Sequence, residues 1–97
     1  MKTVLADAHL LVHGARQEAY AHPLDNFSRI ARIWSAVLGC DVTPEQVGMC
    51  MAGVKLARQA HRQGRDNMVD LAGYAETVQM VIDERARREG DDGPDIS

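Results

Sequence analysis

The sequence lacks several features that mark common classes of protein. It has no apolar run near the roughly 20 residues that span a bilayer, and its N-terminus has no secretory h-region. The two cysteines, Cys40 and Cys50, do not have the spacing of metal ligands. We therefore expect a soluble, cytoplasmic protein, with no membrane contact and with reduced thiols.

Positive charge is not in excess either. The chain has 11 basic and 14 acidic residues and a net charge of −3, so it lacks the electrostatic footprint of a duplex nucleic-acid binder. No glycine-rich phosphate loop is present, and no Ser/His/Asp arrangement suggests a nucleophile. Aromatic residues make up only 4% of the chain, without the basic and aromatic interleaving of RNA readers. Duplex binding and nucleophilic catalysis therefore have no support.

Helix start and stop signals are what the sequence does contain. They predict four helices, at about 4–13, 24–38, 44–61 and 65–88. The third has the clearest start, because Thr43, Pro44 and Gln46 form a capping box with a proline at the first helical position. We expect one domain over residues 1–89, followed by a disordered acidic tail over residues 90–97.

Three of these helices carry apolar residues on two sides. In the second, Phe27 and Trp34 share one stripe and are expected to be buried, while Ile33 and Val37 lie nearly opposite. The core-facing stripe predicted for the fourth consists of Met68, Leu71, Ala72, Ala75, Val78 and Ile82. A domain of this size buries only about 60 to 65% of its unfolded surface, so it has few internal partners for second stripes. We predict an all-α, four-helix bundle completed by homo-oligomerisation.

A basic segment is the first candidate site. Its four members have no acid among them and are Lys55, Arg58, Arg62 and Arg65. Helical rotation places Arg58 among core-facing apolar positions, where a guanidinium needs a partner, and Lys55 at the edge of that face. The segment is a candidate phosphate site. An internal ion pair plus a solvated basic helix end accounts for it equally well.

Asp66 and Asp70 are the second candidate, one turn apart on the fourth helix. Paired carboxylates suit Mg²⁺, which prefers oxygen ligands and brings phosphates with it. The alternative interpretation is that the two acids only neutralise Arg58 and Arg65, with Asp66 as a candidate N-cap.

Histidines give two weaker signals. His9 and His13 are one turn apart and could ligate a metal, but no third ligand is suggested nearby, so we expect a solvated face. Tyr20, His22 and Asn26 cluster around the start of the second helix. They are candidates for binding an anion or the edge of a base there, and the alternative is that they only cap the helix.

Four motifs occur in a characteristic order along the chain. They are R-x-x-x-Y-x-H-P from Arg16, N-F-x-R-I-A from Asn26, K-x-A-R from Lys55 and D-N-x-x-D-x-A-G-Y from Asp66. Together they resemble a small helical family of unknown function found widely in bacteriophages and prophages, over roughly residues 4–85. In such relatives a glycine commonly follows the tyrosine, whereas Ala21 stands here, so we expect the loop to differ slightly.

The motif from Asp66 to Tyr74 is also distantly similar to a metal-binding helix of MazG-like nucleoside triphosphate pyrophosphohydrolases. Those all-α enzymes hold Mg²⁺ between an E-x-x-E helix and an E-x-x-D helix, and cleave between the α- and β-phosphates. Here Met51, Lys55 and Arg58 stand where the first acids are expected. The resemblance therefore implies a nucleotide-sized cleft with a basic as well as an acidic floor.

The leading hypothesis is a phage-encoded, MazG-like helical protein that binds a nucleotide or nucleoside triphosphate in the infected host. In the enzymatic version of this hypothesis, the protein also has Mg²⁺-dependent pyrophosphohydrolase activity. The predicted ligand-binding residues are Arg16, Tyr20, His22, Asn26, Arg29, Lys55 and Arg58, with Asp66 and Asp70 for the metal. One alternative is a non-catalytic, anti-defence protein that sequesters a nucleotide. Another is a module whose second apolar stripes dock on a host protein.

Overall fold

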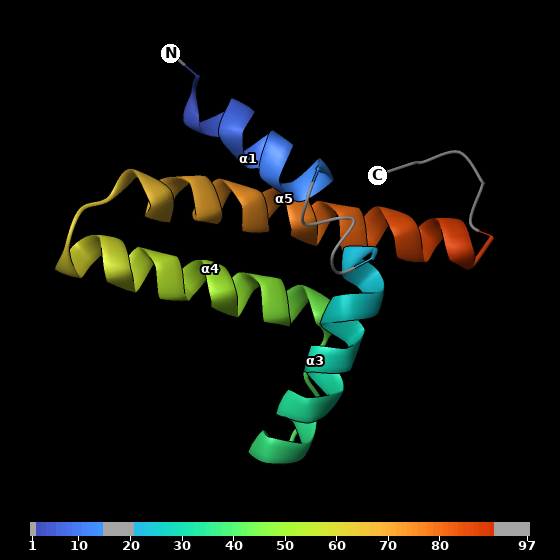
Figure 1. Cartoon of the computed structure of the whole chain (residues 1–97). Coiled ribbons are helices and arrows are strands. Elements are labelled where there is room, and N and C mark those ends of the chain that lie inside the picture. Colours follow the sequence, from blue (N-terminus) through green and yellow to red (C-terminus); the bar gives the residue numbers. More distant parts are fainter. Residues whose placement is uncertain (1, 15–20, 91–97) are drawn as a thin grey trace, which may run out of the picture.

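A computed structural model describes residues 2–14 and 21–90, and these form four helices and no strand. The helices are α1 (Val4–His13), α3 (Pro23–Leu38), α4 (Pro44–His61) and α5 (Arg65–Arg88). Figure 1 shows α4 and α5 side by side as an antiparallel hairpin, with α1 on α5 and with α3 crossing one end of the hairpin and projecting away from it. The predicted all-α class and the helix bounds are confirmed, except that α3 starts one residue earlier.

Local hydrogen bonds explain where the helices begin. The predicted capping box is present, because the Thr43 hydroxyl accepts from the Gln46 amide at 3.1 Å and the Gln46 side chain accepts from the Thr43 amide at 2.9 Å. His22 caps α3, with its Nδ1 accepting from the Leu24 amide at 3.0 Å. Gly39, at φ 71°, ends α3 in the left-handed conformation.

Ala21 adopts a backbone conformation that suits glycine. Its φ is 61°, in the left-handed region that is unfavourable for residues with a Cβ atom. The position therefore keeps the conformation that a glycine would adopt more easily. The expected difference between this loop and that of its relatives stays a prediction.

The core lies where α3 crosses the hairpin. Its buried members come from three helices and are Leu24, Phe27, Ala31, Val47 and Val81. Phe27 is only 2% exposed, as predicted, whereas Trp34 is half-buried. Trp34 is less covered than expected because the distal half of α3 projects beyond the hairpin (Figure 1).

The predicted core face of α5 is wrong. The buried positions of this helix are Val69, Gly73, Thr77 and Val81. Thr77 tolerates burial because its hydroxyl donates to the Gly73 carbonyl at 2.7 Å. A Cβ atom at Gly73 would lie 3.4 Å from the Val12 side chain, in ordinary van der Waals contact, so this position of α5 faces α1 directly. The buried side of α5 therefore carries small and β-branched residues, and the larger apolar residues that we predicted for the core lie beside it.

Two ion pairs tie the C-terminal end of α5 to its neighbours. Arg85 donates two hydrogen bonds to Glu45 of α4, and Arg88 donates to both carboxylate oxygens of Asp25 of α3, at 2.7 and 2.9 Å. These hydrogen bonds hold the pKa of Glu45 and that of Asp25 below their usual values. No helix in the described ranges is both long and apolar enough to cross a membrane.

Candidate functional site

The turn between α4 and α5 determines which residues of the hairpin meet. The Gln59 side-chain oxygen accepts from the Gly64 amide at 3.0 Å and from the Asn67 side chain at 3.2 Å. This closes the short connection 62–64 and fixes the register of the two helices. As a result, Lys55, one turn before Gln59, lies opposite Asp70, about one turn after Asn67.

Lys55 and Asp70 form an ion pair between the two helices. The Lys55 Nζ atom lies 2.9 Å from Asp70 Oδ2, and the two side chains are 14% and 31% exposed. The structure therefore brings together two of the residues that we predicted for the site. Arg58 was predicted to lie on the core face, and this is wrong, because it is exposed. Arg58 is the residue immediately before Gln59, and each residue along a helix adds a rotation of roughly 100°. Its side chain therefore points roughly 100° away from that of Gln59, which is packed.

A small cleft opens beside the ion pair. It has a volume of about 130 Å³ and is lined by Leu11, Val12, Lys55, Asp70, Gly73, Tyr74 and Thr77. The lining combines an ammonium group, a carboxylate, an aromatic ring and an aliphatic wall. Typical ligand pockets measure about 300–1,000 Å³. The cleft therefore suits one part of a ligand, such as a phosphate group or the edge of a base, with the rest lying outside it.

The other predicted ligand residues are not gathered at this cleft. Those that the structure describes, and that do not line it, are His22, Asn26, Arg29, Arg58 and Asp66. Arg16 and Tyr20 lie outside the described residues, as do the tail positions 91–97. His22 instead caps α3, so the capping alternative is confirmed for this residue.

The residues predicted for magnesium do not form a dedicated cage. Asp70 pairs with Lys55, and Asp66 is exposed on the first turn of α5. Within the described ranges, neither belongs to a group of three side chains whose metal-ligating atoms lie close together. Mg²⁺ requires near-octahedral oxygen ligation. In proteins this ligation usually comes from one or two carboxylates together with phosphate oxygens and water, so magnesium binding by Asp66 and Asp70 stays a prediction.

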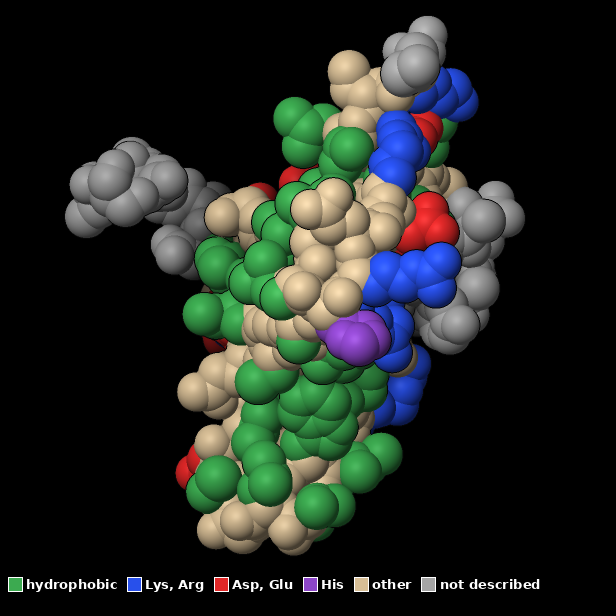
Figure 2. Space-filling model, turned by 90° about the vertical axis from the view of Figure 1, so that its left-hand side faces the viewer, with side chains coloured by type: hydrophobic (Ala, Val, Ile, Leu, Met, Phe, Trp, Pro, Cys, Tyr) green, Lys and Arg blue, Asp and Glu red, His purple; other side chains and the backbone are tan. Residues whose placement is uncertain are grey.

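An open apolar groove is the second surface feature. It has a volume of about 570 Å³ and is lined by Val4, Leu5, Gly48, Met49, Ala52, Met68, Leu71, Ala72, Tyr74, Ala75 and Val78. Most of the stripe that we predicted for the core of α5 lies in this groove. Figure 2 shows hydrophobic side chains over much of one face, down to the projecting α3, with basic side chains along its edge.

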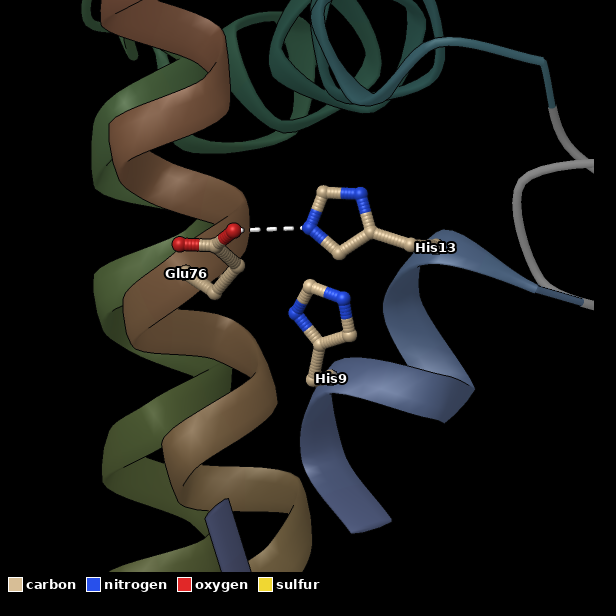
Figure 3. A group of neighbouring side chains, drawn as sticks. All are labelled: His9, His13 and Glu76. Carbon is tan, nitrogen blue, oxygen red and sulfur yellow. Dashed lines mark hydrogen bonds and ion pairs between the residues drawn. The ribbon is translucent and has the colours of Figure 1, made fainter. Parts of the chain in front are cut away.

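A third cluster was not predicted from the sequence. His13 Nε2 lies 2.7 Å from Glu76 Oε2, and the ring centroids of His9 and His13 are 4.5 Å apart (Figure 3). The three residues offer ligand atoms that all lie within 4.8 Å of one another. The spacing of the histidines was the available signal. Glu76 is 63 residues beyond His13, and no local pattern could place it there.

Comparison with known proteins shows phage relatives. The Gene 55 proteins of Mycobacterium phages D29 and L5 are 34% identical over 84 residues and 36% identical over 88 residues. Each alignment covers 86% of this chain and 56% of the relative, so the chain spans little more than half the length of these curated relatives. No solved structure matches the chain.

The family assignment rests on most of the sequence. A family model described as Domain of unknown function (DUF6378) matches residues 3–91. This confirms the resemblance to a phage family of unknown function that the four motifs indicated. Because the model covers nearly the whole chain, the protein belongs to the DUF6378 family.

Proposed function

We propose that this protein binds a nucleotide, or a similar phosphorylated nucleoside, and does not hydrolyse it. The observation that carries the proposal is the Lys55–Asp70 pair beside the cleft. Burying an ammonium group is unfavourable unless it is paired. Here the fold keeps a lysine that is only 14% exposed next to an opening to solvent, where it can meet a ligand.

The groups around the cleft match the parts of a nucleotide. A lysine ammonium has three donor hydrogens, so it can serve both Asp70 and a phosphate oxygen. The Asp70 carboxylate can accept from a sugar hydroxyl or from the edge of a base. Tyr74 lines the cleft, and its ring offers a flat surface to a base.

Binding without turnover is the version that the residues favour. The proposal keeps the helical nucleotide cleft of the MazG-like enzymes but not their metal chemistry, because Met51, Lys55 and Arg58 stand where the first acidic motif of those enzymes is expected. A protein of this kind acts by sequestering its ligand, which in an infected bacterium would lower the concentration of a host nucleotide.

Replacing Lys55 by methionine tests this site. The change removes the charge but keeps most of the volume, and we expect it to weaken nucleotide binding by about 10- to 100-fold, the value of one charge-assisted hydrogen bond. A thermal-shift panel of nucleoside triphosphates and cyclic dinucleotides, with and without Mg²⁺, identifies the ligand, and titration calorimetry measures the affinity.

Arg58→Ala is the matched control, because Arg58 is basic, exposed and on the same helix but does not line the cleft. Its affinity should stay within about twofold of the wild type. Circular dichroism verifies that each variant is folded. The proposal is overturned if no nucleotide raises the melting temperature, if Lys55→Met binds normally, or if the wild type releases pyrophosphate.

The apolar groove supports a second proposal, that the protein self-associates. The chain itself carries a complementary surface, since the projecting end of α3 exposes Ile33, Val37 and Leu38, with Val37 76% exposed. We propose that α3 of one copy lies in the groove of another. If the contact is reciprocal, it forms a closed, two-fold dimer and covers both apolar surfaces at once.

Val37→Glu tests this contact. An unpaired charge in an apolar interface is unfavourable, so we expect a dimeric mass for the wild type at micromolar concentration and a monomeric mass for the variant. Light scattering with size-exclusion chromatography measures both masses. Gln63→Glu adds the same charge at an exposed position in the α4–α5 turn and should remain dimeric. A monomeric wild type contradicts the proposal.

A further inference from the structure

We propose that His9, His13 and Glu76 form a binding site for one transition-metal ion, with Zn²⁺ the best match. Figure 3 shows the two imidazoles projecting from α1, one turn apart, toward the Glu76 carboxylate on α5. The ligand atoms come from two helices far apart in sequence and gather within 4.8 Å of one another. Nothing in the proposed nucleotide site involves these residues.

The packing of α1 holds the two histidines in place. Ala8 and Val12, each 3% exposed, immediately precede His9 and His13 and anchor the neighbouring side of the helix against α5. On α5, the buried Thr77 follows Glu76 and fixes that helix in the same way. The buried neighbours therefore hold the backbone of all three residues in place, so that both histidines face the carboxylate.

The donor set selects the metal. Two imidazole nitrogens and one carboxylate oxygen are one of the known ligand sets of zinc sites that keep an open position, whereas Mg²⁺ and Ca²⁺ prefer oxygen alone. Bonds of about 2.0–2.1 Å in a tetrahedron place ligand atoms roughly 3.3 Å apart. The present separations, from 2.7 Å up to 4.8 Å, bracket that value. Small rotations of side chains that are 35% and 43% exposed, those of His13 and Glu76, are therefore sufficient.

Space for the remaining ligand adjoins the cluster. A shallow recess of about 180 Å³ is lined by Leu5, Ala8, His9, Ala72 and Glu76. Its opening to solvent leaves room for a water molecule or an external ligand in the fourth position of the ion. A bound ion would also connect α1 to α5, so that metal binding stabilises the docking of α1.

Zinc titration of the full chain tests the proposal. After chelation, titration calorimetry with ZnCl₂ should show one saturable site, and Co²⁺ should give the visible absorption of a low-coordination site. Loss of a group that merely orients a metal ligand lowers metal affinity by about 10- to 100-fold, so loss of a ligand itself in His9→Ala or Glu76→Gln should lower it by at least about 100-fold. Zn²⁺ should raise the melting temperature of the wild type but not that of these variants.

Two control variants test whether the zinc response belongs to this cluster. His61→Ala removes an exposed histidine outside the cluster and should bind zinc like the wild type. Lys55→Met removes a residue of the proposed nucleotide site and should also bind zinc like the wild type. The zinc result can therefore be interpreted even if the nucleotide proposal fails. Glu76→Gln preserves the size of the side chain and therefore controls for an effect of the substitution on folding. The proposal is overturned if the wild type shows no stoichiometric zinc binding, or if His9→Ala and Glu76→Gln bind zinc as tightly as the wild type.

Discussion

Phe27→Ala is expected to lower the free energy of unfolding by about 3–5 kcal/mol. Phe27 is 2% exposed and lies in the core where α3 crosses the hairpin. Removing its ring leaves a cavity beside Val47 and Val81, whose short side chains cannot fill it. For a domain of this size, each 1 kcal/mol shifts the melting temperature by about 4–8 °C, so a decrease of at least about 12 °C should be seen by calorimetry or circular dichroism.

Leu56→Ala is the matched control for this prediction. Leu56 is a large apolar residue of α4 that is exposed, so its truncation should change the free energy of unfolding by no more than about 0.5 kcal/mol. A melting temperature for Phe27→Ala near that of the wild type would mean that α3 is not docked through this ring.

Gly48→Ala is expected to destabilise the protein by about 1–3 kcal/mol, although alanine is the better helix former. An added Cβ atom would lie 2.5 Å from the Val78 Cγ2 atom and 3.1 Å from the Phe27 ring. Val78 is β-branched and lies within a helix, where one side-chain rotamer dominates, so its methyl group cannot simply turn away. The resulting strain exceeds the roughly 1 kcal/mol that alanine gains over glycine in a helix.

Gly53→Ala on the same helix should have the opposite effect. A Cβ atom at Gly53 would meet nothing within 4 Å, so only the gain in helix propensity remains, about 0.5–1 kcal/mol of stabilisation. Urea denaturation of both variants measures the two changes. Stabilisation by both would contradict the close contact of α4 with Val78 and Phe27.

Most helix boundaries could be predicted because their signals are local. The Thr43 capping box, Gly39 after α3 and the break at Gly64 each act within a few residues. The buried side of α5 could not be predicted in the same way. Its burial depends on which side of α5 the helices α1, α3 and α4 contact, and that property belongs to pairs of helices and not to the periodicity of one of them.

The candidate sites show the same division. Lys55 and Asp70 were recognised as residues with suitable chemistry, but their pairing depends on the turn that Gln59 closes. Arg58 was placed wrongly because a helix of alternating small and apolar residues has more than one apolar side. Glu76 could not be assigned to the histidines, since only the docking of α1 on α5 brings them together.

The short turn that Gln59 closes also bears on how the chain folds. Closing a three-residue connection loses little chain entropy, and contacts between neighbouring helices have low contact order, so the α4–α5 hairpin is suited to form the folding nucleus. The remaining helices then add to different parts of it, because α1 pairs with Arg65 and Glu76 whereas α3 pairs with Arg88 near the far end of α5. Neither late step requires the other, and the two ends of α5 can therefore acquire their partners in either order along parallel routes.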